Sequence, residues 1–533
     1  MSMIKNPILR GFNPDPSIIR VEDDYYIATS TFEWFPGVQI HHSRDLVHWE
    51  LITRPLNRVS QLDLRGVGAS QGVWAPCLTF HDGLYYLLYT VVNSFYVNMY
   101  DTPNFLVTAT DIRGEWSEPV YLHSYGFDPS LFHDDDGRKY IVSMVTDHRV
   151  MKRYKGHLVL QEYSQQEQRV IGEPVTIYAS ADIYLEGPHI YKRNGYYYLL
   201  AADTGTGEGH GQSILRSKDL FGPYEAYPGN SLMTSRDHPE LLLQKSGHGD
   251  LVETQEGEWY MVHLCGRALE NRTEKGERKY TLGRETALQK VEWTTDGWLR
   301  LSNGTLLPDV EVEGPGLSLQ PFPKRPYRDD FDSEILDIQF QSLRVPLDAT
   351  FYSLAERKGY LRLYGRDGLG SKYRQSLIAR RWQEFKFTAT TCLEFTPTSF
   401  KHLAGLICLY DTQNYYYLHV THDEEIGRCI SILSAVNNRY VVPAGYIALP
   451  DEAQRIWLRV EVDHDQLQFA YSTEGEQAFQ PIGPVLDAST LSDEACHEGW
   501  FTGAFVGLCC QDLTGFRKSA DFDYFEYVEA PGI

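Results

Sequence analysis

The sequence is poor in basic residues and has no long apolar run. Its 533 residues include 49 Lys and Arg against 72 Asp and Glu, a formal net charge of −23. A surface this acidic disfavours nucleic acid and anionic membranes as partners, because both are polyanions. No run reaches the roughly 18 apolar residues of a membrane-spanning helix, and the amino terminus lacks the apolar core of a signal peptide. We therefore expect a soluble, cytoplasmic protein.

Cysteine patterns for metal binding and long amphipathic helix patterns are also missing. The 8 cysteines include no CxxC spacing, so we expect reduced, buried thiols. Aromatic and β-branched runs of five to eight residues alternate instead with Asp, Asn and Gly turns. Aromatic residues make up 13% of the chain, and they suit half-buried strands. The sequence therefore predicts an all-β protein.

One pattern recurs five times in the first half of the chain. A turn leads into an aromatic run, and about ten residues before each run lies a short approach segment. The approach segments are Asp15-Pro16, Ala75-Pro76, Asp128-Pro129, Gly187-Pro188 and Gly249-Asp250, spaced by 53 to 62 residues. The aromatic runs are 25–31, 85–91, 140–146, 196–203 and 259–264. A period of this length with hairpin chemistry in each unit predicts a five-bladed β-propeller.

Equivalent positions in propeller blades converge on one axis, so residues at these segments are candidates for a single site. The five candidates are Asp15, Trp74, Asp128, Glu186 and His248. The alternative is that Asp-Pro is only a turn dipeptide. That alternative is weakened because the carboxylates recur in phase with the repeat and because blade two has Ala75 at this position.

The second half of the chain follows a different pattern. A segment rich in Pro, Gly and Glu spans residues 308–326, and beyond it the repeat is gone. Short strand-like segments continue to the end, which is typical of a β-sandwich of jelly-roll or concanavalin-like type. We predict a propeller over residues 1–322 and a sandwich over 323–533. Segments 328–332 and 520–527 are expected to pair, since domain termini usually lie close together.

Three motifs then identify a family resemblance. FNPDPS (12–17), GFDPSLF (126–132) and LEGPHIY (185–191) resemble glycoside hydrolase family 43, and the resemblance covers the whole chain. The trailing sandwich and GAFVGLCC (503–510) are similar to its two-domain β-xylosidase branch. The resemblance implies that Asp15 is a general base, Glu186 a general acid, and Asp128 a third carboxylate that orients the acid and raises its pKa. An inverting glycosidase needs such a base and acid on opposite sides of the sugar.

The resemblance also implies a sugar pocket. Phe32, Trp74 with Ala75, and Phe127 are expected as its walls, Arg284 as a donor to sugar hydroxyls, Thr206 near the leaving group, and Phe505 of the second domain over the rim. The alternatives are a surface salt bridge for Arg284 and ordinary core packing for Trp74 and Phe127. No cofactor is expected. Some relatives hold calcium near the residue matching His248, but one imidazole is poor calcium chemistry, and a hydrogen bond to a catalytic carboxylate is favoured.

The expected function is an inverting, exo-acting β-D-xylosidase that releases xylose from the non-reducing ends of xylo-oligosaccharides. The main alternative is an α-L-arabinofuranosidase, or one enzyme with both activities. A carbohydrate-binding propeller without catalysis has no need of three in-phase carboxylates, and a retaining fructan-cleaving propeller has different motifs. By analogy with two-domain relatives, a homodimer or homotetramer is expected.

Overall fold

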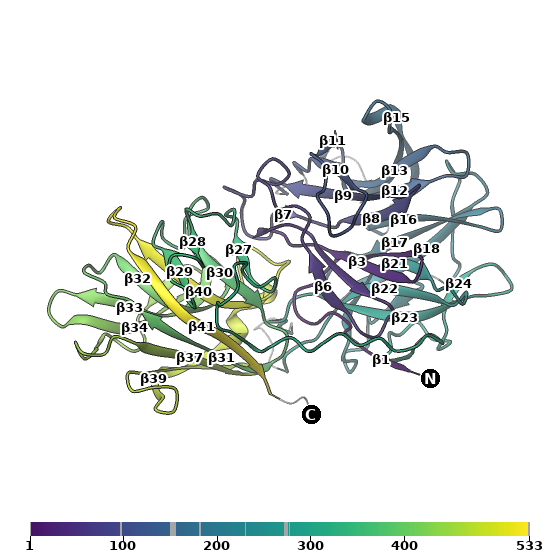
Figure 1. Ribbon diagram of the computed structural model, residues 1–533. Helices are drawn as coiled ribbons and strands as arrows, with labels where there is room; N and C mark the ends of the chain where they lie inside the picture. Colours follow the sequence, from purple (N-terminus) through teal and green to yellow (C-terminus); the bar gives the residue numbers. More distant parts are fainter. Residues whose placement is uncertain are drawn as a thin grey trace.

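The chain folds into two all-β bodies joined by an extended linker (Figure 1). The structure is a computed structural model that describes residues 2–95, 99–149, 156–180, 183–229, 231–270, 276 and 278–530. No helix in these residues is long and apolar enough to cross a membrane. The first body is a five-bladed β-propeller and the second a β-sandwich, so the predicted fold class is confirmed.

Each blade is an antiparallel sheet whose strands follow one another in the sequence. Blade one contains β2 (Ser17–Val21), β3 (Asp24–Thr29), β5 (Gln39–Ser43) and β6 (Glu50–Thr53). Blade two contains β8 (Cys77–His81), β9 (Leu84–Val92), β10 (Asn104–Ala109) and β11 (Val120–His123), with β7 (Gly72–Val73) also paired to β9. Blade three contains β12 (Phe127–His133), β13 (Lys139–Val145), β14 (Gly156–Ser164) and β15 (Arg169–Ser180).

The last two blades keep the same order. Blade four contains β16 (Leu185–Arg193), β17 (Tyr196–Asp203), β18 (Gly211–Ser217), β19 (Glu225–Ala226) and β20 (Met233–Thr234). Blade five contains β21 (Gln244–Glu253), β22 (Trp259–Gly266), β23 (Glu285–Trp293) and β24 (Leu299–Leu301). The five predicted aromatic runs are the second strands of the blades, and the approach segments lie at or in the first strands.

The first strands of the blades form the ring around the axis. β2 contacts β8, β8 contacts β12, β12 contacts β16, β16 contacts β21, and β21 returns to β2. The two ends of the propeller also pair with each other beside blade five, where β1 (Met3–Lys5) pairs with β25 (Glu311–Glu313) and β25 contacts β23. The repeated approach segments are thereby brought to one place.

The second body consists of two antiparallel sheets. The first contains β26 (Arg328–Asp329), β28 (Tyr352–Ser353), β29 (Leu361–Tyr364), β31 (Lys386–Glu394), β37 (Ile456–Asp463), β38 (Gln466–Ser472), β39 (Gln480–Asp487) and β41 (Ser519–Glu529). The second contains β27 (Gln341–Leu343), β30 (Ser376–Arg381), β32 (His402–Asp411), β33 (Asn414–Asp423), β34 (Gly427–Val436), β35 (Arg439–Val441), β36 (Ile447–Ala448) and β40 (Phe505–Asp512). Large apolar side chains from both sheets form the core between them.

A strand from the propeller completes the second sheet of the sandwich. β4 (Trp34–Phe35), which follows the second strand of blade one, pairs with β27. The predicted pairing of the sandwich ends is present, because Arg328 and Asp329 pair with Glu526 and Phe525. The predicted boundary after residue 322 lies between β25, the last strand paired within the propeller, and β26.

The cysteines behave as small apolar residues. All 8 are buried, and none forms a disulfide with another described residue. Burial raises the pKa of the Cys77 thiol to about 12, which keeps it protonated and unreactive. The expectation of reduced, buried thiols is confirmed.

Candidate active site

The approach segments bend where they reach the propeller axis. Asp15, Asp128 and His248 adopt left-handed backbone conformations, with φ of 53°, 50° and 52°, and Gly187 has φ of 53°. In β12, β16 and β21 the pairing register shifts at this point, as expected for β-bulges that redirect a side chain. A Cβ atom on Gly187 would lie 2.6 Å from Nε2 of His248, so glycine is required for blades four and five to approach so closely.

A cavity of about 50 Å³ lies at this end of the axis. It is lined by Asp15, Phe32, Trp74, Ala75, Phe127, Asp128, Glu186, Thr206, His248, Arg284 and Phe501. The structure therefore brings together every residue predicted for the site except Phe505. Residues from all five blades and from the sandwich contribute to one pocket.

Asp15 is held by two short hydrogen bonds. Ser30 Oγ donates to its Oδ2 at 2.6 Å, and Arg284 Nη1 donates to its Oδ1 at 2.6 Å. The side chains of Asp15 and Arg284 are only 5% and 3% exposed, so the alternative of a surface salt bridge for Arg284 is wrong. Arg284 Nη2 also donates to the carbonyl of Phe501 at 3.1 Å, which ties the catalytic side of the pocket to the sandwich.

Glu186 and Asp128 form a coupled pair of carboxyl groups. Burial raises the pKa of Glu186 to about 7, with a further increase from the Asp15 charge and a decrease from Arg284. Burial, together with the charges of Glu186 and Asp15, also raises the pKa of Asp128 well above its usual range. The pair thus holds a proton near neutral pH.

The hydrogen bonds indicate where that proton lies. Asp128 Oδ2 accepts a hydrogen bond from the backbone N–H of Gly187 at 3.1 Å, which stabilises a negative charge on Asp128. Glu186 accepts no hydrogen bond from any described residue that would stabilise its ionised form. The hydrogen bond from Gly187 favours an ionised Asp128 and a protonated Glu186, the arrangement that an acid beside an ionised carboxylate requires, whereas burial and the Glu186 charge raise the pKa of Asp128 and act in the opposite direction.

Aromatic rings form the walls of the pocket. Trp74 contacts Phe127 edge to face at 5.5 Å between ring centroids and contacts Phe501 at the same distance. Phe32 lies 6.1 Å from Phe501 and 5.3 Å from the Arg284 guanidinium. Trp74 and Phe127 are buried, so they serve both as packing and as pocket lining. This combination explains why sequence reasoning left the two interpretations open.

The prediction for Phe505 is wrong, and Phe501 occupies the expected place. Phe505 is fully buried in β40 and stacks on Trp34 at 3.7 Å, inside the junction between the two bodies. The residues of β40 are enclosed on both faces, so none of them reaches the rim. The loop before β40 does, and its Gly499-Trp500-Phe501 sequence, with aromatic residues outside a strand pattern, was the available signal. Tyr100 does not line the pocket but stacks on the wall residue Phe127 from behind the lining, a contact that the sequence did not indicate.

The surroundings of His248 do not fit a calcium ion. His248 Nδ1 lies 3.8 Å from Asp15 Oδ1, too far for the hydrogen bond that the sequence analysis favoured, and its ring packs against Gly187. Burial lowers the pKa of His248 to about 4, so the imidazole is neutral. Calcium prefers several oxygen ligands, and within the described part of the chain no three His, Cys, Asp or Glu side chains converge to hold a metal.

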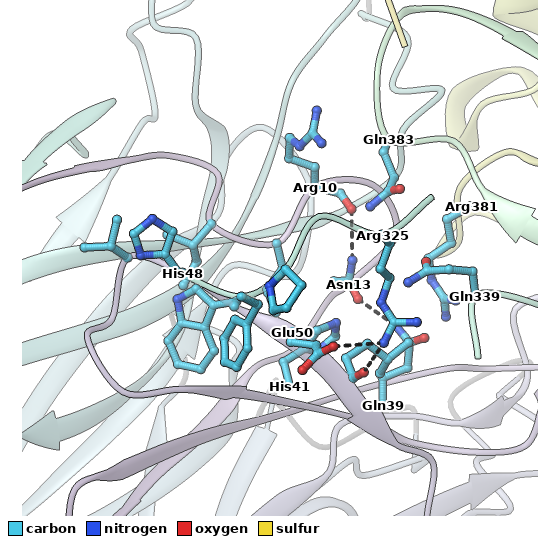
Figure 2. Close-up of a pocket in the computed structure, with 17 residues that line it drawn as sticks. Arg10, Asn13, Gln39, His41, His48, Glu50, Arg325, Gln339, Arg381 and Gln383 are labelled. Carbon is cyan, nitrogen blue, oxygen red and sulfur yellow. Dashed lines mark hydrogen bonds and ion pairs between the residues drawn. The ribbon is translucent and has the colours of Figure 1, made fainter. Parts of the chain in front are cut away.

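A larger cavity of about 390 Å³ lies between blade one, the linker and the sandwich (Figure 2). None of the predicted site residues lines it. Its carboxylate, Glu50, is paired with Arg325 at 3.1 Å, and Asn13 is bonded to Gln39 at 2.7 Å. Because this cavity has no free carboxyl pair, acid–base chemistry is assigned to the smaller pocket at the propeller axis.

A propeller whose axis ends in a pocket with three carboxyl groups that share a proton near neutral pH has the arrangement of a glycoside hydrolase. Residues 4–299 match the family described as glycosyl hydrolases family 43, and residues 328–528 match the β-xylosidase C-terminal concanavalin A-like domain. The chain belongs to glycosyl hydrolases family 43.

Three relatives show how close the likeness is. A xylan 1,3-β-xylosidase of Vibrio sp is 44% identical over 99% of both chains. A xylosidase/arabinosidase 43B of Humicola insolens is 46% identical over 99% of this chain and 98% of the relative. The crystal structure of a xylan β-1,4-xylosidase from Bacillus halodurans C-125 is 51% identical, with a TM-score of 0.96 over 99% of this chain and 100% of that one.

Proposed function

We propose that the protein is an inverting, exo-acting β-D-xylosidase that releases xylose from the non-reducing ends of xylo-oligosaccharides. The observation that carries this proposal is the pocket in which Asp15, Asp128 and Glu186 meet aromatic walls. The names of two relatives, both xylosidases, support xylose as the sugar. They differ in the stated linkage, so the proposal commits to the sugar and not to one linkage.

Asp15 is the proposed general base. Its two hydrogen bonds to Ser30 and Arg284 fix the orientation of the carboxylate. In that orientation it accepts a proton from a water molecule as the water attacks the anomeric carbon. One face of the sugar is attacked while the leaving group departs from the other, which inverts the anomeric configuration.

Glu186 is the proposed general acid. With a pKa of about 7 a large share of Glu186 is protonated in neutral solution, and this form gives its proton to the departing glycosidic oxygen. Asp128 holds the negative charge beside it and hydrogen-bonds the Gly187 N–H, so it both favours protonation of Glu186 and fixes the adjacent backbone. Thr206 lines the same pocket and is assigned to the leaving-group side.

Exo action follows from the closure of the pocket by the sandwich. Phe501 contacts Phe32 and Trp74, so residues of the second body cover one side of the sugar site. A covered pocket accepts the end of a chain and excludes its middle. The same closure makes xylo-oligosaccharides a better substrate class than a polymer. A homo-oligomeric state remains a proposal by analogy, to be measured by light scattering.

An α-L-arabinofuranosidase activity on the same site is the second candidate. It is favoured by the relative from Humicola insolens, whose name gives both activities. The two sugars place similar hydroxyl groups in a pocket of this size, so one enzyme is able to process both.

The deciding experiment compares 4-nitrophenyl β-D-xylopyranoside and 4-nitrophenyl α-L-arabinofuranoside with wild-type protein and Asp15→Asn. We expect faster hydrolysis of the xyloside and a loss of about 10²- to 10⁴-fold in kcat for Asp15→Asn on both substrates. Faster hydrolysis of the arabinofuranoside would move the assignment to the second candidate. No turnover of either substrate, with sugar binding retained, would contradict the enzymatic proposal.

A further inference from the structure

Ser70 connects two walls of the sugar pocket to the junction between the two bodies. It is fully buried in the segment that leads into blade two, with φ of 58°. Its carbonyl accepts a hydrogen bond from Nε1 of Trp74 at 3.0 Å. Its Oγ accepts two more, from the backbone N–H groups of Trp500 at 3.0 Å and Phe501 at 3.1 Å. One serine therefore contacts a propeller wall and the sandwich wall.

Glu33 holds Ser70 in turn. The Ser70 N–H lies 3.2 and 3.1 Å from the two carboxylate oxygens of Glu33. Glu33 follows the pocket residue Phe32 directly, and its carbonyl accepts from the backbone N–H of Arg344 at 2.8 Å. Its carboxylate lies 4.0 Å from the Arg344 guanidinium, and both side chains are 1% exposed. Glu33 is not among the residues that line the pocket, so this buried carboxyl group, whose pKa burial raises to about 7, calls for another role.

The loop that carries Phe501 is fixed at several points. Arg284 donates to the Phe501 carbonyl, and the Thr502 N–H donates to the hydroxyl of Tyr410. A Cβ atom on Gly499 would lie 2.6 Å from Ser70 Oγ, so the loop approaches Ser70 as closely as glycine permits. The Ser70 hydroxyl is the propeller's contact to the N–H groups of Trp500 and Phe501.

We propose that Ser70, held by Glu33, is a positioning residue that fixes Phe501 over the sugar pocket, so that docking of the second domain sets the affinity for the sugar. This inference rests on the proposed function and names the residues that regulate its pocket. The Phe501 ring is in place before the sugar binds, so it stabilises the bound substrate and the transition state equally. Loss of such an interaction raises KM more than it lowers kcat.

The test begins with Ser70→Ala and Ser70→Gly, assayed for hydrolysis of 4-nitrophenyl β-D-xylopyranoside and for D-xylose binding by calorimetry. Both variants remove the hydroxyl, and glycine also suits the positive φ, so a fold defect from backbone strain is avoided. We expect KM and the Kd for D-xylose to rise about tenfold, with kcat changed less than threefold, because a buried pair of N–H groups loses its acceptor.

A double-mutant cycle with Phe501→Ala separates positioning from general stability. If Ser70 acts through Phe501, Ser70→Ala adds nothing to the KM of the Phe501→Ala variant. Gly499→Ala disturbs the same contact from the loop side with the hydroxyl retained, and the same rise in KM is expected. The matched control is Ser43→Ala, since buried Ser43 Oγ also accepts two backbone N–H groups, at 3.2 and 2.9 Å, but at an outer turn of blade one. It should keep the wild-type KM.

Two results would overturn the inference. One is a wild-type KM and xylose Kd in Ser70→Gly and Gly499→Ala, and the other is full additivity of Ser70→Ala with Phe501→Ala. A failure of the proposed function would give a different result. In that case wild-type protein would bind D-xylose but would not hydrolyse the xyloside.

Discussion

Replacing Asp128 by asparagine tests how the site keeps its acid protonated. Asparagine has nearly the same shape, and its amide oxygen still accepts the hydrogen bond from the Gly187 N–H, which is 3.1 Å from Asp128 Oδ2 in the structure. The substitution therefore removes a negative charge beside Glu186 and leaves the backbone contact in place. Its main effect should be electrostatic.

The expected size follows from the pKa of Glu186. Burial and then the Asp15 charge raise the pKa of Glu186 from 4.5 to about 7, which stabilises the protonated form by about 3 kcal/mol at about 1.4 kcal/mol for each pKa unit, and the charge of an ionised Asp128 adds to this rise. A neighbouring like charge accounts for about one to two units of such shifts. Without the Asp128 charge Glu186 ionises more easily, so its pKa falls. The alkaline limb of kcat/KM, which marks loss of the protonated acid, should then move by about one to two units towards acid pH.

The assay is the pH dependence of kcat/KM for 4-nitrophenyl β-D-xylopyranoside in both proteins. The matched control is Asp134→Asn, which removes the charge of a second aspartate of blade three, one that is paired with Lys192 at 2.6 Å and lies outside the pocket. In the control, the alkaline limb of kcat/KM should lie at the same pH as in the wild-type protein. An unmoved limb in a folded Asp128→Asn protein would refute the reasoning and would place the shared proton on Asp128.

The remaining predictions concern the acid and the second domain. Glu186→Ala should lose several orders of magnitude of activity on xylobiose but much less on substrates with acidic phenol leaving groups, because such groups depart without protonation. The two substrates are measured side by side. Equal losses on both would show that Glu186 is not the acid. Phe505→Ala should lower the free energy of unfolding by about 3–5 kcal/mol in a denaturant titration with little change in KM, because a fully buried ring is lost from the junction. A raised KM without destabilisation would show that Phe505 contacts the sugar at the pocket rim. A chain ending near residue 322, which keeps the β1–β25 pair of the propeller, should aggregate in light scattering, because β4 loses its partner β27 and the apolar junction is exposed. A soluble, fully active product would show that the second domain is not part of the site.

Most of the site was predictable because the propeller repeats. Equivalent positions in a repeat converge by symmetry, so finding Asp15, Asp128 and Glu186 in phase was enough to place three carboxyl groups together. His248 and Trp74 followed from the same phase. The alternation of strand-like runs and turn residues also predicted the β-structure of the sandwich, whose strands begin and end near turn residues.

The contribution of the second domain was harder to predict because it depends on docking between two folded bodies. Phe501 and Phe505 are both aromatic, four residues apart, and only the enclosure of β40 in the sheet shows which one is core. No local pattern indicates that Trp34 and Phe35, in a propeller loop, pair with a sandwich strand. The hydrogen bonds that Ser70 makes to Trp500 and Phe501 span more than 400 residues of sequence, so they belong to the tertiary structure alone.

Proton NMR of freshly released sugar tests the central claim most directly. The claim is that Asp15 activates water on one face of the sugar while Glu186 protonates the leaving oxygen on the other. Wild-type protein is mixed with a β-linked xyloside, and the anomeric signals of xylose are followed before mutarotation equilibrates them. The account predicts α-xylose as the first product. β-Xylose as the first product would mean a covalent intermediate and would contradict the proposed roles of the carboxyl groups.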